Sequence, residues 1–331
     1  MTNTLSSRRS FTALALAAGV SLFLFDQTGQ AIAQTAAYPT HDITLIVPYA
    51  PGASADILSR QYAALLSEIL KVTVVVSNSP GGSGTIGTVE IFGADPDGYT
   101  IGYGHNSPLA VQPHNNAGLP YKNVEDFTTI GGIGHQSGTV SVNSASDWQT
   151  FDDFLQAAKA DPGAISIAVG AAGNVKDMQL QQFQKAAGVE FNIVPFAGGG
   201  AEAVTAVLGR IVDAVSVNAS SVRGQIESGD IRPLAIFANS DAEEIDGFHV
   251  VTAKEFPGME YLQDSSGIIA PKGLPDDIRA VLESAHQTIM KNKDFIAALE
   301  ADSYLVDPAD SEGYRAQLLE DYANFGDILG K

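Results

Sequence analysis

The sequence predicts an α/β protein of two lobes, each a mainly parallel β-sheet flanked by helices. Three observations support this class. Short apolar runs rich in β-branched residues alternate with segments of helical spacing, and small-residue loops join them. The chain has 331 residues, enough for two domains. Its apolar fraction of 45% supplies the side chains for two cores.

The first third of the chain alternates strand, helix, strand, helix and strand. Residues 43–47 (ITLIV) form a continuous apolar run typical of a buried parallel strand, and residues 54–70 carry apolar positions at helical spacing. Apolar runs predict two further strands over 72–76 and 99–103, and the pattern predicts a helix over 85–92 between them. This alternation indicates a mainly parallel sheet.

The middle of the chain repeats the alternation with a different sequence. Turn residues at 161–163 (DPG) end one helix, and Gly188 is placed to follow the end of another. Two late helices begin with acidic residues, which suit the positive end of a helix dipole. The expected helices are 151–160, 175–187, 201–208, 275–290 and 312–328, and the expected strands are 165–169, 191–194 and 212–217.

Composition excludes several kinds of site. The absence of cysteine excludes disulfides, thiolate zinc sites, iron–sulfur clusters and a cysteine nucleophile. The formal net charge of −20 argues against nucleic acid as a partner, because such binding needs a basic surface. The six histidines form no pair at metal-ligand spacing, so we expect neither a metal nor a cofactor.

The first 33 residues have the features of a secretory signal peptide. Arg8 and Arg9 form a basic region, an apolar run covers 14–25, and residues 31–33 (AIA) form a cleavage site. We expect cleavage after Ala33 and a periplasmic protein. The segment 7–11 (SRRSF) fits both an ordinary secretory signal and a twin-arginine signal, and both stay open.

One weak motif indicates dinucleotide binding. Gly82, Gly84 and Gly87 match the G-x-G-x-x-G fingerprint between a strand and a helix. The gap after Val76 is long for a tight turn, and the next strand ends without an acidic residue for a ribose hydroxyl. A P-loop and a G-x-S-x-G nucleophile elbow are both absent from the sequence. A hydrolase whose catalytic triad assembles only in space stays an alternative.

Four loops of small residues carry the positive signal. Each follows a predicted strand and opens a helix: 50–56 (APGASAD), 81–84 (GGSG), 170–174 (GAAGN) and 197–200 (AGGG). Such loops present backbone N–H groups and the positive end of a helix dipole, so they bind a carboxylate or phosphate without arginine. The alternative is that these glycines only serve the backbone geometry of α/β turns.

Taken in order, the segments resemble the substrate-binding proteins of tripartite tricarboxylate transporters, the Bug family of extracytoplasmic solute receptors. The resemblance covers essentially the whole chain after the leader. Its individual pieces are modest, but their order is specific. They are 43–56 (ITLIVPYAPGASAD), 94–100 (ADPDGYT), 119–127 (LPYKNVEDF), 194–198 (VPFAG), 216–218, 229–236 (GDIRPLAI) and 269–275 (IAPKGLP).

The resemblance implies a two-lobed periplasmic-binding-protein fold of the type II, Venus-flytrap kind. It places the first part of lobe 1 in 34–136, lobe 2 in 137–263, and the completion of lobe 1, with the C-terminal helices, in 264–331. It implies a non-catalytic monomer that captures a small carboxylate and delivers it to the membrane permease subunits of the transporter. A sensory receptor that presents its ligand to a membrane kinase is the alternative.

The resemblance also implies which residues bind the ligand. They are Tyr49, Pro51, Gly52, Ala53, Ser54, Asp56, Ala172, Gly173, Lys176, Asp177, Phe196, Ala197, Gly198 and Asn218.

Some of these positions depart from the family pattern. Ala53 replaces a glycine, and Lys176 and Asp177 replace small residues and a histidine. Either Lys176 neutralises a second carboxylate and Asp177 accepts from an amino or hydroxyl group, or the two form a solvated pair in the first turn of a helix. Tyr49 and Phe196 either sandwich a flat ligand or pack in the cores.

Overall fold

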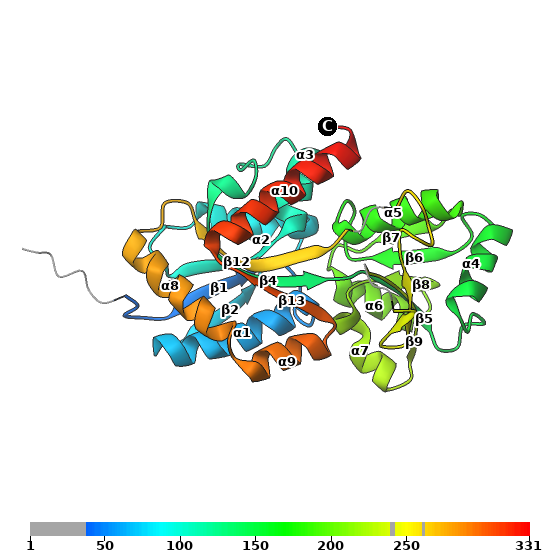
Figure 1. The fold of residues 1–331 in the computed structure, drawn as a ribbon, viewed down its shortest axis with the longest axis horizontal. Helices are drawn as coiled ribbons and strands as arrows, with labels where there is room; N and C mark the ends of the chain where they lie inside the picture. The colour runs from blue at the N-terminus through cyan, green and yellow to red at the C-terminus, as the bar shows by residue number, and fades with distance from the viewer. Residues whose placement is uncertain (1–37, 239–241, 260–261) are drawn as a thin grey trace, which may run out of the picture. The chain divides into compact units, whose positions relative to one another are not determined.

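The computed structural model describes residues 38–238, 242–259 and 262–331. The expected signal peptide and its cleavage after Ala33 lie outside these residues. The described residues group into one compact unit that contains two β-sheets, each with helices on both faces (Figure 1).

The first sheet has six strands in the order β13-β4-β12-β3-β1-β2. Its strands are β1 (Ile43–Val47), β2 (Val74–Asn78), β3 (Thr100–His105), β4 (Phe127–Gln136), β12 (Asp264–Pro271) and β13 (Tyr304–Ala309). Three helices pack on one face, namely α1 (Ser54–Leu70), α8 (Asp276–Ile289) and α9 (Lys293–Ala301). The other face carries α2 (Thr85–Gly93), the short α3 (Gln112–Asn115) and α10 (Ser311–Leu329) (Figure 1). Short 3₁₀ turns, η1 (Gly82–Gly84) and η3 (Val124–Asp126), and one π-helical turn, η2 (Ser107–Val111), complete this part.

Each face of the six-stranded sheet has its own core. Tyr62 of α1, Leu282 of α8 and Phe295 of α9 are buried in one core. Ile91 of α2 and Tyr314 of α10 are buried in the other. Because both faces of the sheet are covered, its strand β1 (ITLIV) is a continuous apolar run rather than an alternating one.

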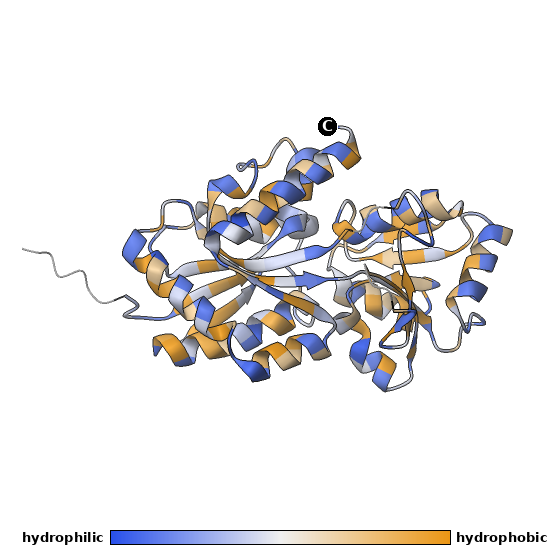
Figure 2. Cartoon of the chain, viewed as in Figure 1, coloured by the Kyte–Doolittle hydropathy of each residue, from blue (hydrophilic) through white to orange (hydrophobic). Residues whose placement is uncertain are grey.

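The second sheet has seven strands in the order β10-β11-β9-β5-β8-β6-β7. They are β5 (Thr139–Asn143), β6 (Ser166–Val169), β7 (Asn192–Pro195), β8 (Ala214–Ser216), β9 (Ile231–Phe237), β10 (Glu244–Ile245) and β11 (Phe248–Val251). Its helices are α4 (Phe151–Ala160), α5 (Val175–Ala187), α6 (Gly200–Leu208) and α7 (Ala219–Glu227). The aromatic core of α4 and α5 and the aliphatic core of α6 and α7 are separate clusters. Figure 2 shows hydrophobic residues concentrated on these strands and on one side of α4.

The two sheets share one strand order. The first contains β2-β1-β3-β12-β4, and the second contains β7-β6-β8-β5-β9. In each, a strand that follows a crossing from the other sheet (β12 or β5) is inserted antiparallel between two neighbours. Helices follow β1, β2, β6, β7 and β8, so their N-termini lie at the carboxyl ends of these strands. In open α/β sheets this is the edge where ligands bind.

The α/β class and the two-lobed fold are confirmed, and α1 and α4 have the predicted bounds. Most strands of each sheet run in one direction, as expected, but each sheet also contains antiparallel strands. Strand β12 pairs antiparallel with β3 and β4, and β5 pairs antiparallel with β8 and β9. These strands enter from the other sheet and therefore run against their neighbours.

The expected domain boundaries stay a prediction. Strands up to Gln136 and from Asp264 belong to the six-stranded sheet, and strands from Thr139 to Val251 belong to the seven-stranded sheet. This membership is what a division at 136/137 and 263/264 requires.

Candidate functional site

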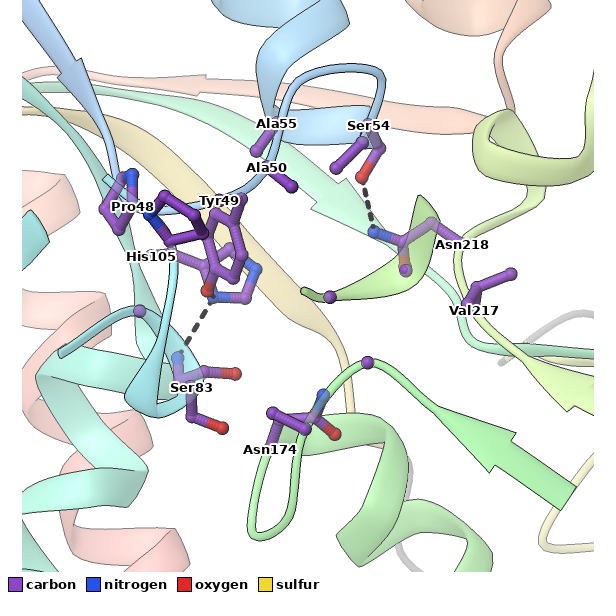
Figure 3. A pocket seen from close by; sticks show the side chains of 18 of the residues that line it. Pro48, Tyr49, Ala50, Ser54, Ala55, Ser83, His105, Asn174, Val217 and Asn218 are labelled. Atoms are coloured by element: carbon purple, nitrogen blue, oxygen red, sulfur yellow. Dashed lines mark hydrogen bonds between the residues drawn. The ribbon is translucent and has the colours of Figure 1, made fainter. Parts of the chain in front are cut away.

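A pocket lies where the carboxyl ends of the two sheets face each other. Its walls come from the loops that precede α1, α2, α5, α6 and α7, together with residues at the ends of β3 and β12. The empty space is about 700 Å³, part of it open to solvent, which is in the range of small-molecule sites. Figure 3 shows Tyr49, Ser83 and His105 on one side of it, and Asn174, Val217 and Asn218 on the other.

The loop between β1 and α1 is held by Asp56 from behind the pocket. The Oδ2 atom of Asp56 accepts from Gly52 N at 2.9 Å and from Arg60 Nε at 3.0 Å, and its Oδ1 atom accepts from Asn78 Nδ2 at 2.9 Å. Burial raises the pKa of this carboxyl, but the hydrogen bonds from Arg60, Gly52 and Asn78 outweigh it, and the net pKa is lowered. Asp56 is therefore fully engaged in fixing the loop.

The same device recurs in the two glycine loops of the seven-stranded sheet. Gly173 N donates to Asp177 Oδ2 at 2.6 Å, and Gly198 N donates to Glu202 Oε2 at 2.7 Å. In each loop the acid lies four residues after the glycine, inside the first turn of the helix, as in the pair of Gly52 and Asp56. These carboxylates hold one loop amide away from the pocket and fix the conformation of the rest.

Most helices that open at the pocket have no side-chain cap. The N-cap residues of α1, α2, α6 and α7 line the pocket and make no capping hydrogen bond; they are Ala53, Gly84, Gly199 and Asn218. By contrast, side chains cap α4, α9 and α10 away from it. Helix α5 at the pocket is capped by Asn174, and α8 elsewhere is uncapped. Uncapped N-termini keep donors and a positive dipole end available to an anion.

A buried polar chain forms one wall of the pocket. Tyr49 OH lies 3.1 Å from His105 Nδ1, and Ser107 N donates to the same Nδ1 atom at 3.1 Å. Since Nδ1 accepts, the ring proton is on Nε2, which lies 3.5 Å from Asp264 Oδ2. Lys176 Nζ bonds to this same Oδ2 atom.

Burial dominates the electrostatics of this chain. It lowers the pKa of His105 to about 3, with a further lowering from Lys176, so the imidazole is neutral at physiological pH. It lowers the pKa of Lys176 well below its ordinary value and raises that of Tyr49 well above its own. The wall therefore offers a ligand no exposed cation.

Direct contacts join the loops of the two sheets around the pocket. Asn218 Nδ2 donates to Ser54 Oγ at 3.0 Å (Figure 3). Ser83 Oγ donates to the carbonyl of Ala172 at 3.1 Å, and Gln112 Nε2 donates to the carbonyl of Gly173 at 2.8 Å. These bonds describe a closed arrangement of the two loop sets.

The residues predicted from the sequence divide into two groups. Those in the pocket wall are Tyr49, Ala53, Ser54, Lys176, Ala197, Gly198 and Asn218. Those outside the pocket wall are Pro51, Gly52, Asp56, Ala172, Gly173, Asp177 and Phe196. Gly52, Asp56, Ala172, Gly173 and Asp177 of this group form the loop bonds described above, and Phe196 packs against the core of α6 and α7. Lys176 is buried against Asp264 rather than paired with Asp177 at a solvated surface.

Sequence reasoning missed several wall residues. The sequence predicts an anion-binding loop at 81–84 but no site residue in it, whereas Gly81, Ser83 and Gly84 line the pocket. No motif marked His105 or Asp264, because both come from strand ends without a glycine loop. Only pairing of β12 with β3 brings Asp264 beside His105.

Two negative findings apply to the described residues alone. Over 38–238, 242–259 and 262–331, no three His, Cys, Asp or Glu side chains are grouped so that they would hold a metal ion. Within the same ranges, no helix is long and apolar enough to cross a membrane.

Comparison with known proteins gives consistent results. The model of the tripartite tricarboxylate transporter family receptor matches residues 58–329. Protein BugT of Bordetella pertussis is 30% identical over 291 residues, which are 86% of this chain and 88% of that protein. A solved structure described as a periplasmic transporter is 31% identical, with a TM-score of 0.82, over 89% of this chain and 98% of that one. An R. palustris protein solved with adipate has a TM-score of 0.82 at 24% identity, over 88% and 97% of the two chains, a likeness of fold.

Proposed function

Because the chain belongs to the tripartite tricarboxylate transporter receptor family, we propose that it captures a small organic acid in this pocket and delivers it to the membrane permease of such a transporter. One observation carries the choice of an acid. Four uncapped helix N-termini, from both sheets, converge on a pocket that has no exposed cation.

Backbone amides suit this task in so acidic a molecule. A carboxylate in a buried pocket accepts N–H bonds that are charge-assisted, and the dipole ends add to the attraction. The carboxylates of Asp56, Asp177 and Glu202 hold the loops in place beforehand, so little ordering remains to oppose binding. Small organic acids are the ligand class that this arrangement favours.

The mechanism we propose is closure of the two loop sets around the acid. The bonds between Ser54 and Asn218, and between Ser83 and Ala172, join the two sets only when they meet. A ligand that contacts both sets binds the closed form better and shifts the equilibrium toward it. The closed form is then the one presented to the permease. Export to the periplasm and cleavage after Ala33 are part of this proposal.

The test is a ligand screen on the purified protein, stripped of bound ligand by unfolding and refolding. Thermal unfolding is followed with small carboxylates, amino acids, sugars and nicotinamide cofactors. A ligand at about 100 times its Kd stabilises the folded state by about 2.7 kcal/mol, a clear shift. We expect shifts with carboxylates alone. Shifts with cofactors or sugars, or none with any acid, would contradict the proposal.

A turnover assay separates a receptor from an exported hydrolase that uses the same pocket. We expect no hydrolysis of chromogenic esters by the purified protein, at the same protein concentration at which it binds the acid. Hydrolysis that disappears in the Tyr49→Phe variant would instead assign chemistry to the polar wall.

A further inference from the structure

One end of the pocket is lined by an acid and an amine that are already joined to each other. Asp264 and Lys176 are 7% and 5% exposed, both line the pocket, and Lys176 Nζ bonds to Asp264 Oδ2. The pair is neutral as a whole, wherever the shared proton resides. It comes from β12 and α5, elements of different sheets, so it forms as the two loop sets meet.

Two side chains that line this pocket each have an oxygen atom that is an acceptor without a donor among the described residues. These atoms are Asp264 Oδ1 and Asn218 Oδ1, both buried, and the hydroxyl of Ser216, another pocket-lining residue, also lacks a partner. A buried acceptor without a donor is unfavourable, and native proteins pair such groups with protein, water or ligand. A ligand in the pocket that carries a hydrogen-bond donor would supply the missing partner.

The charges around Asp264 select among possible donors. A second carboxylate supplies no donor, and it would lie beside Asp264 with Lys176 already engaged. An ammonium group supplies donors, but it would lie next to Lys176, a like charge in a buried place. A hydroxyl group donates to Asp264 Oδ1 and adds no charge. His105 on the same carboxylate is neutral and does not alter this order.

We propose that the ligand is a hydroxylated monocarboxylic acid, whose carboxylate lies at the helix N-termini and whose hydroxyl donates to Asp264. Asp264 is then the residue that selects against a second carboxylate. This inference rests on the proposed capture of an organic acid and names its class. It also answers the question left by the sequence, because Lys176 serves Asp264 and not a second carboxylate of the ligand.

The test compares acids of equal length that differ in one group. For chains of four and six carbons, isothermal titration measures Kd for the unsubstituted acid, the dicarboxylate, the terminal amino acid, and the 2-hydroxy and terminal hydroxy acids. We expect a hydroxy acid to bind at least tenfold tighter than the other three compounds of its length. A dicarboxylate that binds tightest would overturn this inference and leave the proposed function standing. Binding of no acid at all would overturn both.

Two variants locate the selectivity. Asp264→Asn frees Lys176, so we expect at least a tenfold gain for the dicarboxylate and loss of the hydroxyl preference. Lys176→Met removes the amine that is bonded to Asp264, so we expect the terminal amino acid to bind more tightly than it does to the wild type. Asp276→Asn, at a side chain that is 93% exposed, is the charge-matched control and should keep the wild-type order. If either variant fails to fold, the order of ligand affinities in the other variant and in the wild type still tests the proposal. An unchanged ligand order in a folded variant would overturn the role of Asp264.

Discussion

At the scale of single residues, the acids near the pocket do different work. Asp56 lies behind the wall and holds a loop through Gly52 and Asn78, whereas Asp264 lies in the wall with one oxygen atom unpartnered. Asp56 belongs to the first turn of α1, and Asp264 is the first residue of β12. The direction of each side chain, which the fold sets, separates a loop-positioning acid from a ligand-facing one.

Replacing Asp56 by alanine should therefore lower stability and affinity together. The change removes a buried acceptor of several hydrogen bonds, and we expect a loss of about 2 kcal/mol in the free energy of unfolding. The Kd for the acid found in the screen should rise as the loop loosens. Urea unfolding and titration measure the two effects. Thr150→Ala, which removes the cap of α4, should cost about 1 kcal/mol and leave Kd unchanged. A Kd unaffected in Asp56→Ala would show that the loop holds without it.

Stability should fall as the pH is lowered below 6.5, because burial lowers the pKa of three histidines in the folded chain, His105, His135 and His286. Burial lowers the pKa of His286 to about 4 and that of His105 to about 3, from an ordinary value of 6.5. Below pH 6.5 the unfolded chain binds protons that the folded chain does not. Lowering the pH therefore stabilises the unfolded state and lowers the free energy of unfolding. His286 and His105 each account for about 2 kcal/mol between pH 6.5 and about 5.

The variant His286→Gln isolates one of these contributions. His286 accepts from Tyr62 OH at 3.0 Å and donates to the carbonyl of Gly132 at 3.1 Å, and the glutamine amide offers an acceptor and a donor in their place. Urea unfolding at a series of pH values should show a smaller slope in this window, because one of the three histidine contributions is removed. A slope equal to that of the wild type would refute the assignment.

At the scale of elements, close approach of two loops sets the shape of the pocket. A Cβ atom at Gly170 would lie 3.0 Å from Gly200 N, at the start of α6. Gly170→Ala should therefore displace the first turn of α6, lower stability by about 1–3 kcal/mol and weaken acid binding.

Gly224 offers the matched control in the same sheet. It is exposed within α7, and a Cβ atom there meets nothing within 4 Å. Gly224→Ala should stabilise the protein by about 0.5–1 kcal/mol with Kd unchanged, since alanine is the better helix former. Thermal unfolding and titration measure the stability and the Kd of both variants. Equal changes in the two variants would contradict the close approach at Gly170.

Elements with one clear periodicity were predictable from the sequence. Helix α1 begins at Ser54, where a breaking segment ends, and ends at Leu70 as predicted. Gly188 takes the left-handed conformation expected after α5, with φ of 65°. Strands β4 and β12 were not predicted, because β4 (FTTIGGIGHQ) contains glycines where other segments of the chain pack against it. Their pairing depends on contacts between distant parts of the chain.

At the scale of the whole molecule, the sequence predicted which loops meet but not what they close on. The loops around Ala53 and Gly198 were visible as glycine-rich strand ends, and both line the pocket. The pair of Lys176 and Asp264 was not visible, since the partners are 88 residues apart and come from different sheets. Such a pair exists only once the two halves of the fold are assembled.

The absence of an exposed cation from the pocket wall has a kinetic consequence. The chain carries a formal net charge of −20, so an approaching acid anion is repelled until it reaches the amides at the helix ends. The range of this repulsion shrinks from about 30 Å at 0.01 M salt to about 8 Å at 0.15 M. Stopped-flow measurement should show the association rate rising several-fold over this interval while the dissociation rate stays nearly constant. The protein would thus bind its ligand faster at 0.15 M salt than at 0.01 M salt.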